Sequence, residues 1–205
     1  FSKKSFNNKY GVPLSMFNTP EQSKFTVFEV GMNKTGEIDK LSKLIQPNLG
    51  LITNISYAHI KNFKNLNQIA EAKGEIINNI ISNGTMIINM DDKYYKFFLK
   101  KTIKKGLKKF TFSRRNHQAD IILLDQKKYK NSFLFKIKIK GIVKNFVISK
   151  ELSSYKENIL ASLSIIANYF DIKKLRKNLF QGFRIPKSRG SLIKYKKGSK
   201  KLIVL

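Results

Sequence analysis

Short apolar runs alternate with longer stretches of helical spacing along the first 118 residues. The short runs are rich in β-branched, aromatic and aliphatic side chains and are bounded by polar residues, which is typical of strands buried on both faces. Strand, helix and strand in this order predict right-handed βαβ units and a parallel sheet. The expected strands are 25–30, 49–54, 85–89 and 109–113, and the expected helices are 37–46, 66–82 and 93–104.

The pattern changes near residue 119. Phe135, Ile137 and Ile139 alternate with lysines, which predicts a half-exposed antiparallel sheet. Ser154 and Glu157 have the spacing of a capping box for a helix over about 155–169, and Asp171 is expected to cap a short helix that follows. The fold class is therefore α/β, with a mostly parallel sheet flanked by helices over 1–118 and an antiparallel subsheet, helices and final strands over 119–205.

Both ends of the chain shape the expected domain organisation. Residues 1–24 read as loop and short turns around Gly11 and Pro13. The last run, KLIVL, reads as a buried strand with no loop after it, and the chain opens without Met. We expect a piece of a longer protein, with one incomplete domain over 1–205.

Charge and composition narrow the function classes. The chain carries 41 Lys and Arg against 13 Asp and Glu, but only five of the basic residues are arginine, and the lysine excess accompanies many Asn and Ile, whose codons are A/T-rich. We therefore attribute the charge of +28 to composition and expect no nucleic-acid partner, although a basic binding module that stacks bases on Tyr94, Tyr95, Phe97 and Phe98 stays open.

The composition also bears on metal sites and on the location of the protein. The absence of cysteine excludes thiolate chemistry, and two histidines exclude a histidine-rich metal centre. No apolar run approaches the roughly 18 residues of a membrane span, so we expect no membrane insertion and a cytoplasmic protein.

Two charged residues stand at positions where the pattern predicts apolar side chains. Glu29 interrupts the 25–30 run, and an unpaired buried carboxylate is costly, so it needs a cation, a hydrogen-bond network or a cleft, or it simply reaches solvent. Lys73 lies on the apolar stripe of 66–82, four residues from both Ile69 and Ile77. Either its stem packs while the ammonium reaches water, or it points into a cleft formed by the strand ends.

Five motifs in order over residues 5–92 resemble the ATP-dependent Mur ligases. The E-x-G-x-N-x-x-G-E-I form of the second motif is similar to that of the dipeptide-adding members. The motifs are NNKYGVPL (7–14), EVGMNKTGEI (29–38), TNISYAHI (53–60), AKGE (72–75) and NMDD (89–92).

The resemblance implies a P-loop NTPase-like central domain and an acyl-phosphate mechanism. ATP would phosphorylate the carboxylate of UDP-N-acetylmuramoyl-tripeptide, and D-alanyl-D-alanine would attack it, in peptidoglycan precursor synthesis by a monomeric enzyme. Such chemistry needs divalent metal, here two Mg²⁺ ions. By position Glu29 and His59 are the implied metal ligands, and Lys73 the lysine that becomes carbamylated to help hold the second ion. A loop histidine without metal is the alternative for His59.

Further site residues follow from the same resemblance. Asn8 and Asn54 are expected to line the catalytic cleft, Asn158 to contact adenine and Arg189 to reach the ATP phosphates. The family's histidine four residues before the adenine-contacting Asn is Ser154 here, a departure in the adenine pocket. The pair Asp91 and Asp92 reads as a turn, with metal binding as the alternative.

Large parts of the family pattern are not in this sequence. No G-x-x-G-K-[ST] occurs, so we expect the first strand and the P-loop before Phe1, and we expect the N-terminal substrate domain and the C-terminal domain to lie outside the chain. The 205 residues alone are predicted to be inactive. A sister Mur ligase, a folylpolyglutamate-type ligase and a catalytically dead scaffold are the remaining alternatives.

Overall fold

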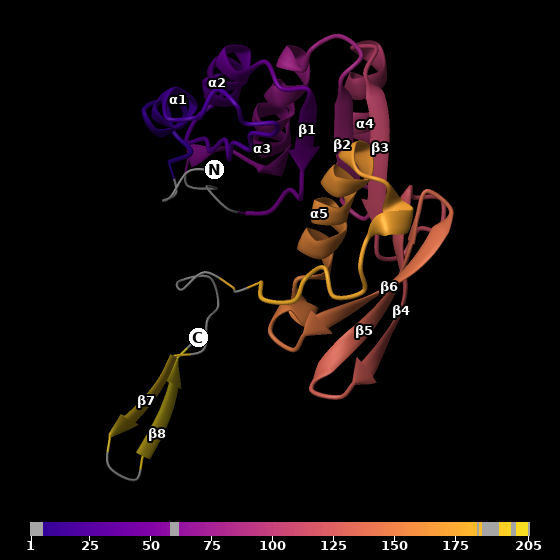
Figure 1. The fold of residues 1–205 in the computed structure, drawn as a ribbon. Helices are drawn as coiled ribbons and strands as arrows, with labels where there is room; N and C mark the ends of the chain where they lie inside the picture. The colour runs from indigo at the N-terminus through magenta and orange to yellow at the C-terminus, as the bar shows by residue number, and fades with distance from the viewer. Residues whose placement is uncertain (1–5, 58–61, 184, 186–192, 198–199, 205) are drawn as a thin grey trace.

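A six-stranded mixed sheet forms the centre of the structure (Figure 1). The structure is a computed structural model of the chain, and it describes residues 6–57, 62–183, 185, 193–197 and 200–204. Neighbouring strands pair in parallel from β1 to β4 and antiparallel from β4 to β6. The strands are β1 (Leu49–Ile52), β2 (Thr85–Asn89), β3 (Lys108–Ser113), β4 (Ile121–Tyr129), β5 (Ser132–Ile139) and β6 (Ile142–Ser149). Strands β7 (Ile193–Lys197) and β8 (Lys200–Val204) form a separate antiparallel pair.

Helices occupy most of the connections between the parallel strands. Their bounds are α1 (Gly11–Phe17), α2 (Glu37–Ile45), α3 (Leu66–Lys73), α4 (Tyr95–Lys104) and α5 (Lys156–Tyr169), with 3₁₀ helices η2 (Gly74–Asn79), η3 (Leu152–Ser154) and η4 (Ile172–Lys174). No described helix is long and apolar enough to cross a membrane. The α/β class and the antiparallel subsheet predicted from the sequence are confirmed.

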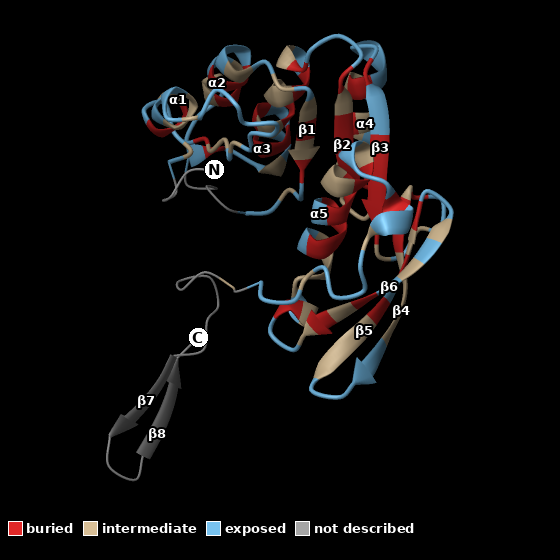
Figure 2. Cartoon of the chain, viewed as in Figure 1, coloured by how far each residue is buried: buried red, intermediate tan, exposed pale blue. Residues whose placement is uncertain are grey.

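Opposite faces of the sheet are covered by different helices, because alternate strand residues point to opposite sides. Ile87 of β2 packs in a cluster with α5, whereas its neighbours Met86 and Ile88 pack with α3, η2 and α4. Buried residues accordingly concentrate along β2, β3 and the inner side of α5 (Figure 2). The helix expected over 93–104 is present as α4, and its Phe98 is 1% exposed inside this core.

The predicted strand at 25–30 is wrong. These residues belong to no strand, and Phe25 and Val27 are 54% and 61% exposed. A strand needs a neighbour for its backbone groups, and an open cavity separates this segment from β1. The βαβ unit expected from 25–54 is therefore not formed, whereas α2 and β1 lie where the pattern placed them.

Three other predictions are corrected by local geometry. The helix expected over 66–82 ends as an α-helix at Lys73 and continues as the 3₁₀ helix η2. The capping box at 154–157 is absent, because Tyr155 is the N-cap of α5 and the hydroxyl of Ser154 donates to the carbonyl of Glu151. Within the expected loop 1–24, residues 11–17 form α1, which Asn8 caps from outside the helix.

Candidate active site

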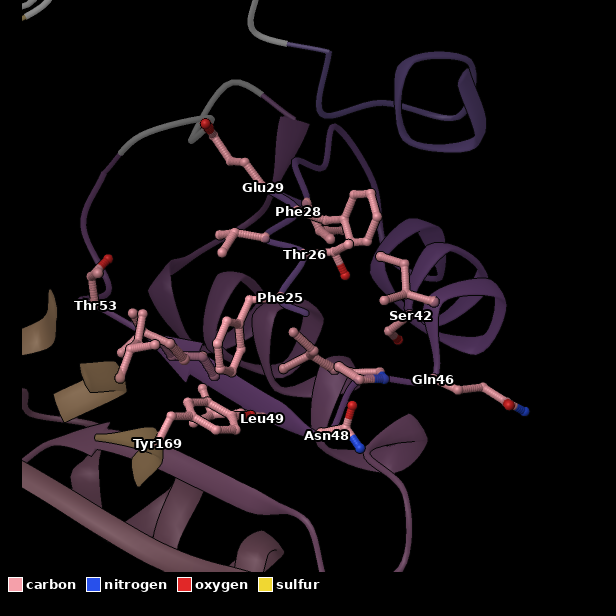
Figure 3. A pocket seen from close by; sticks show the side chains of 18 of the residues that line it. Phe25, Thr26, Phe28, Glu29, Ser42, Gln46, Asn48, Leu49, Thr53 and Tyr169 are labelled. Atoms are coloured by element: carbon pink, nitrogen blue, oxygen red, sulfur yellow. The ribbon is translucent and has the colours of Figure 1, made fainter. Parts of the chain in front are cut away.

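A cavity of about 1060 Å³ lies between residues 24–30 and β1 (Figure 3). Lys73 of α3, Asn158 of α5 and Glu29 of the extended segment all line it. At the other end, Phe25 packs against Tyr169 and Phe170, with ring centroids 5.1 and 5.5 Å apart. The structure thus brings three sequence-predicted site residues, from three separate elements, around one space.

The carboxylate of Glu29 is held at the edge of this cavity by the N-terminal segment. The side-chain amide of Asn7 donates to Glu29 Oε1 at 3.1 Å, and the Asn7 carbonyl accepts from the backbone N–H of Gly31 at 2.7 Å. Asn7 therefore orients the Glu29 side chain and fixes the backbone two residues beyond it. Sequence reasoning missed Asn7, and the available signal was its place as the first Asn of the NN pair in the first motif.

Asn8 has a different local role from its neighbour. Its side-chain oxygen accepts hydrogen bonds from the backbone N–H groups of Tyr10 and Gly11, at 3.0 and 2.9 Å. This satisfies donors at the start of α1 that have no partner within the helix. The catalytic role implied for Asn8 stays a prediction.

Lys73 reaches the end of β1 through its ammonium group. Its Nζ donates to the backbone carbonyl of Asn54 at 3.0 Å, and the side chain is half-buried. Burial lowers the pKa of the Lys73 amine, and the negative charge of Asp92 partly opposes this. Lys73 thus points toward the cavity, which is one of the two alternatives left open by the sequence. At a given pH, a larger fraction of its amine is neutral than in an exposed lysine.

The two aspartates after β2 accept hydrogen bonds from three backbone N–H groups and one hydroxyl. Asp91 accepts from the Ser113 hydroxyl and the Arg114 N–H, at 2.5 and 2.6 Å. Asp92 accepts from the N–H of Ile55 at 2.7 Å and from that of Tyr94 at 2.8 Å. These contacts tie the ends of β1, β2 and β3 together, which supports the turn interpretation of this pair.

Of the remaining predicted site residues, two are described by the structure and two are not. Asn158 is exposed in the first turn of α5, next to Glu157, whose carboxylate pairs with Arg114 at 3.2 Å. Asn54 is exposed and enters the site through its backbone carbonyl. His59 and Arg189 lie outside the described residues, so their predicted roles have no structural test.

The donors around the cavity suit a hard cation that also binds phosphate. Mg²⁺ in phosphoryl-transfer sites is held by one or two carboxylates together with substrate phosphates and water, and Glu29 supplies one carboxylate here. Within the part of the chain that the structure describes, no three Asp, Glu or His side chains cluster as a metal site. Glu29 could hold such an ion together with the phosphates of a nucleotide and water.

Comparison with known proteins places the chain in a family. The family model of the Mur ligase middle domain matches residues 1–166. The chain belongs to the Mur ligase family. A Mur ligase relative, the UDP-N-acetylmuramoyl-tripeptide--D-alanyl-D-alanine ligase of Haemophilus influenzae, is 37% identical over 110 residues, which cover 54% of this chain and 24% of the relative.

Solved Mur ligase structures share the fold. MurF from Acinetobacter baumannii superposes with a TM-score of 0.80 at 23% identity, covering 98% of this chain and 43% of that chain. The MurF ligase of Thermotoga maritima in complex with ADP gives a TM-score of 0.65 at 23% identity, covering 78% of this chain and 36% of that chain. The present chain thus spans about a quarter of the length of the Haemophilus relative and less than half of these structures.

Proposed function

We propose that the protein containing these residues joins D-alanyl-D-alanine to UDP-N-acetylmuramoyl-tripeptide with ATP, in the cytoplasm, as a step of peptidoglycan precursor synthesis. The observation that carries the proposal is that one cavity is lined by Glu29, Lys73 and Asn158. The chain belongs to the Mur ligase family, and its relatives include ligases named for this reaction.

The predicted site residues have distinct roles in this reaction. The tripeptide carboxylate takes the terminal phosphoryl group of ATP, the dipeptide amine attacks the resulting acyl phosphate, and phosphate leaves. Glu29 would hold Mg²⁺, together with His59, which is assigned from the sequence motif alone. When bound, the ion neutralises charge on the transferring phosphoryl group. Asn158 would contact adenine, Arg189 the phosphates, and Asn8 and Asn54 the reacting groups.

Lys73 is suited to carbamylation. The neutral amine attacks the carbon of CO₂ and loses a proton, which yields a carbamate with one negative charge. Burial lowers the pKa of Lys73 and so increases the neutral fraction that can react. The carbamate would turn a cation at the cavity wall into an oxygen donor for the second Mg²⁺.

A strand and phosphate-binding loop from outside these 205 residues would complete the site. β1 is the first strand of the described sheet and pairs with β2 alone, so its other edge faces the cavity. An unpaired edge of this kind accepts a further strand. The extended residues 25–30 form the opposite wall, which gives an added strand a neighbour on each side.

Product analysis tests the proposed reaction. The complete gene product, incubated with ATP, Mg²⁺, UDP-N-acetylmuramoyl-tripeptide and D-alanyl-D-alanine, should yield UDP-N-acetylmuramoyl-pentapeptide by mass spectrometry, and the 205-residue chain alone should yield none. Product with a single amino acid instead of the dipeptide would identify a sister ligase. No product with any amine would overturn the ligase function.

A further inference from the structure

Glu75 lies two residues beyond Lys73 but points toward a different helix. Its Oε1 accepts from the backbone N–H of Gly36 at 2.7 Å, and its Oε2 accepts from the backbone N–H of Asp39 at 3.0 Å. Gly36 is the N-cap residue of α2, and Asp39 is the third residue of that helix. One carboxylate from η2 thus satisfies two backbone donors at the start of α2.

This contact replaces a capping box. In a capping box the N-cap side chain binds the third N–H of the helix while the third side chain binds the N-cap N–H. Gly36 has no side chain and adopts a left-handed φ of 86°, and α2 has no side-chain cap of its own. Glu75 supplies both acceptors from another part of the chain, and its charge also suits the positive end of the helix dipole.

The capped end of α2 is continuous with the loop that carries Glu29. Glu37 accepts from the backbone N–H groups of Asn33 and Lys34, at 2.6 and 3.3 Å, and these hydrogen bonds, the one from Asn33 foremost, lower the pKa of Glu37. The other end of the loop is held where Gly31 donates to the Asn7 carbonyl. The loop therefore has an anchor at each end, and Glu75 is the anchor that comes from η2, which begins directly after Lys73.

We propose that Glu75 is a positioning residue, which holds the Glu29 loop in a fixed place relative to Lys73 through the start of α2. The chemistry proposed for the cavity requires a carboxylate at 29 and a carbamate at 73 to face the same metals and phosphates, so this role rests on the proposed function. Groups behind metal ligands change metal affinity or activity by about 10- to 100-fold when they are removed.

Amide hydrogen exchange on the complete gene product tests the contact itself. In Glu75→Gln the neutral side chain keeps one acceptor and turns an NH₂ group toward the second amide, so exchange at Gly36 and Asp39 should be about tenfold faster or more. Glu71→Gln is the matched control, because Glu71 is an exposed glutamate in the preceding turn of α3. Equal exchange in wild type and Glu75→Gln would overturn the proposal.

Mg²⁺ titration of the complete gene product tests the positioning role. Glu75→Gln should raise the Mg²⁺ concentration for half-maximal phosphate release by about tenfold or lower kcat by a similar factor, with a smaller change in the KM for ATP. If Glu75→Gln does not fold, Glu75→Asp keeps the charge but is one methylene shorter, and should show a weaker form of the same shift.

The outcomes separate this role from its alternatives. Faster exchange with an unchanged Mg²⁺ dependence and kcat would mean that Glu75 only stabilises α2, and would overturn the positioning role. A wild-type protein with no Mg²⁺-dependent phosphate release would instead overturn the ligase function on which the role rests. If the wild type is active and Glu75→Gln has the same Mg²⁺ dependence, only the positioning role fails, so the two failures can be told apart.

Discussion

The ammonium group of Lys73 donates a hydrogen bond to the backbone carbonyl of Asn54, 3.0 Å away, and so joins the end of α3 to the residues after β1. The lysine is half-buried beside the cavity that Glu29 also lines. This contact fixes the direction of the Lys73 amine at the wall of the cavity. It also places a titratable group where its protonation affects folding.

Stability should rise with pH because of Lys73. Its pKa in the folded chain lies below the ordinary value of 10.5, so between these two values the unfolded chain binds more protons. The destabilising contribution is complete below the folded pKa and is lost as pH rises toward 10.5. Urea unfolding from pH 7 to 10.5 should show wild type gaining stability relative to Lys73→Met.

Lys105→Met, at the exposed end of α4, is the control for this pH series. A difference between wild type and Lys73→Met that is constant over the whole range would contradict the assigned burial of Lys73.

Removing the charge of Asp92 should destabilise the fold. Its two oxygens accept from the N–H groups of Ile55 and Tyr94, and charge-assisted bonds of this kind contribute about 1.5–3 kcal/mol each. We expect Asp92→Asn to lower the free energy of unfolding by about 2 kcal/mol, measured by denaturant titration. The pKa of Lys73 should fall further, since Asp92 raises it.

Asp125→Asn is the comparison for Asp92→Asn, because Asp125 pairs with the exposed Lys127 at 3.3 Å. Exposed pairs contribute about 0–1 kcal/mol. An equal decrease in the free energy of unfolding in the two variants would argue against the structural role of Asp92.

Gly31→Ala should impair activity more than stability. A Cβ at this position would lie 2.9 Å from Cγ of Asn7, so the Asn7 side chain must move and its hydrogen bond to Glu29 is lost. Because Asn7→Ala removes the same bond, the Gly31→Ala and Asn7→Ala double variant should be little worse than either single one. Steady-state kinetics of the complete gene product provide the comparison, and fully additive losses would contradict a shared route through Glu29.

The open edge of β1 should become protected in the longer protein. In the 205-residue chain, amides of 25–30 and those of β1 that face away from β2 should exchange rapidly, since these segments have no strand between them. In the complete gene product both sets should slow together. Slowing of neither set would contradict the proposed added strand.

Regular elements were predictable from the sequence because their side-chain periodicity matches the burial that the structure shows. The lysine alternation around Phe135 and Ile137 corresponds to β5, where the apolar residues are buried. Residues 25–30 have a strand-like composition too, but composition cannot show whether a neighbouring strand is present to pair with them. Strand formation there depends on tertiary context, which a local pattern does not contain.

The sequence motifs were enough to predict which residues line the candidate site. They were not enough to predict the hydrogen bonds that hold those residues in place. Glu29 and Lys73 stood out because a charge on an apolar run is costly, and both line the cavity. Asn7 and Glu75 carry no such signal, since each acts through hydrogen bonds to groups 22 to 39 residues away. Contacts of that range follow from the folded arrangement.

Phosphate release by the complete gene product tests the account most directly. With ATP, Mg²⁺ and UDP-N-acetylmuramoyl-tripeptide, release should require D-alanyl-D-alanine and should fall by about two orders of magnitude or more in Glu29→Ala and Lys73→Ala. Release that is independent of the dipeptide, or that survives both substitutions, would contradict the assignment of this cavity as the active site of a dipeptide-adding ligase.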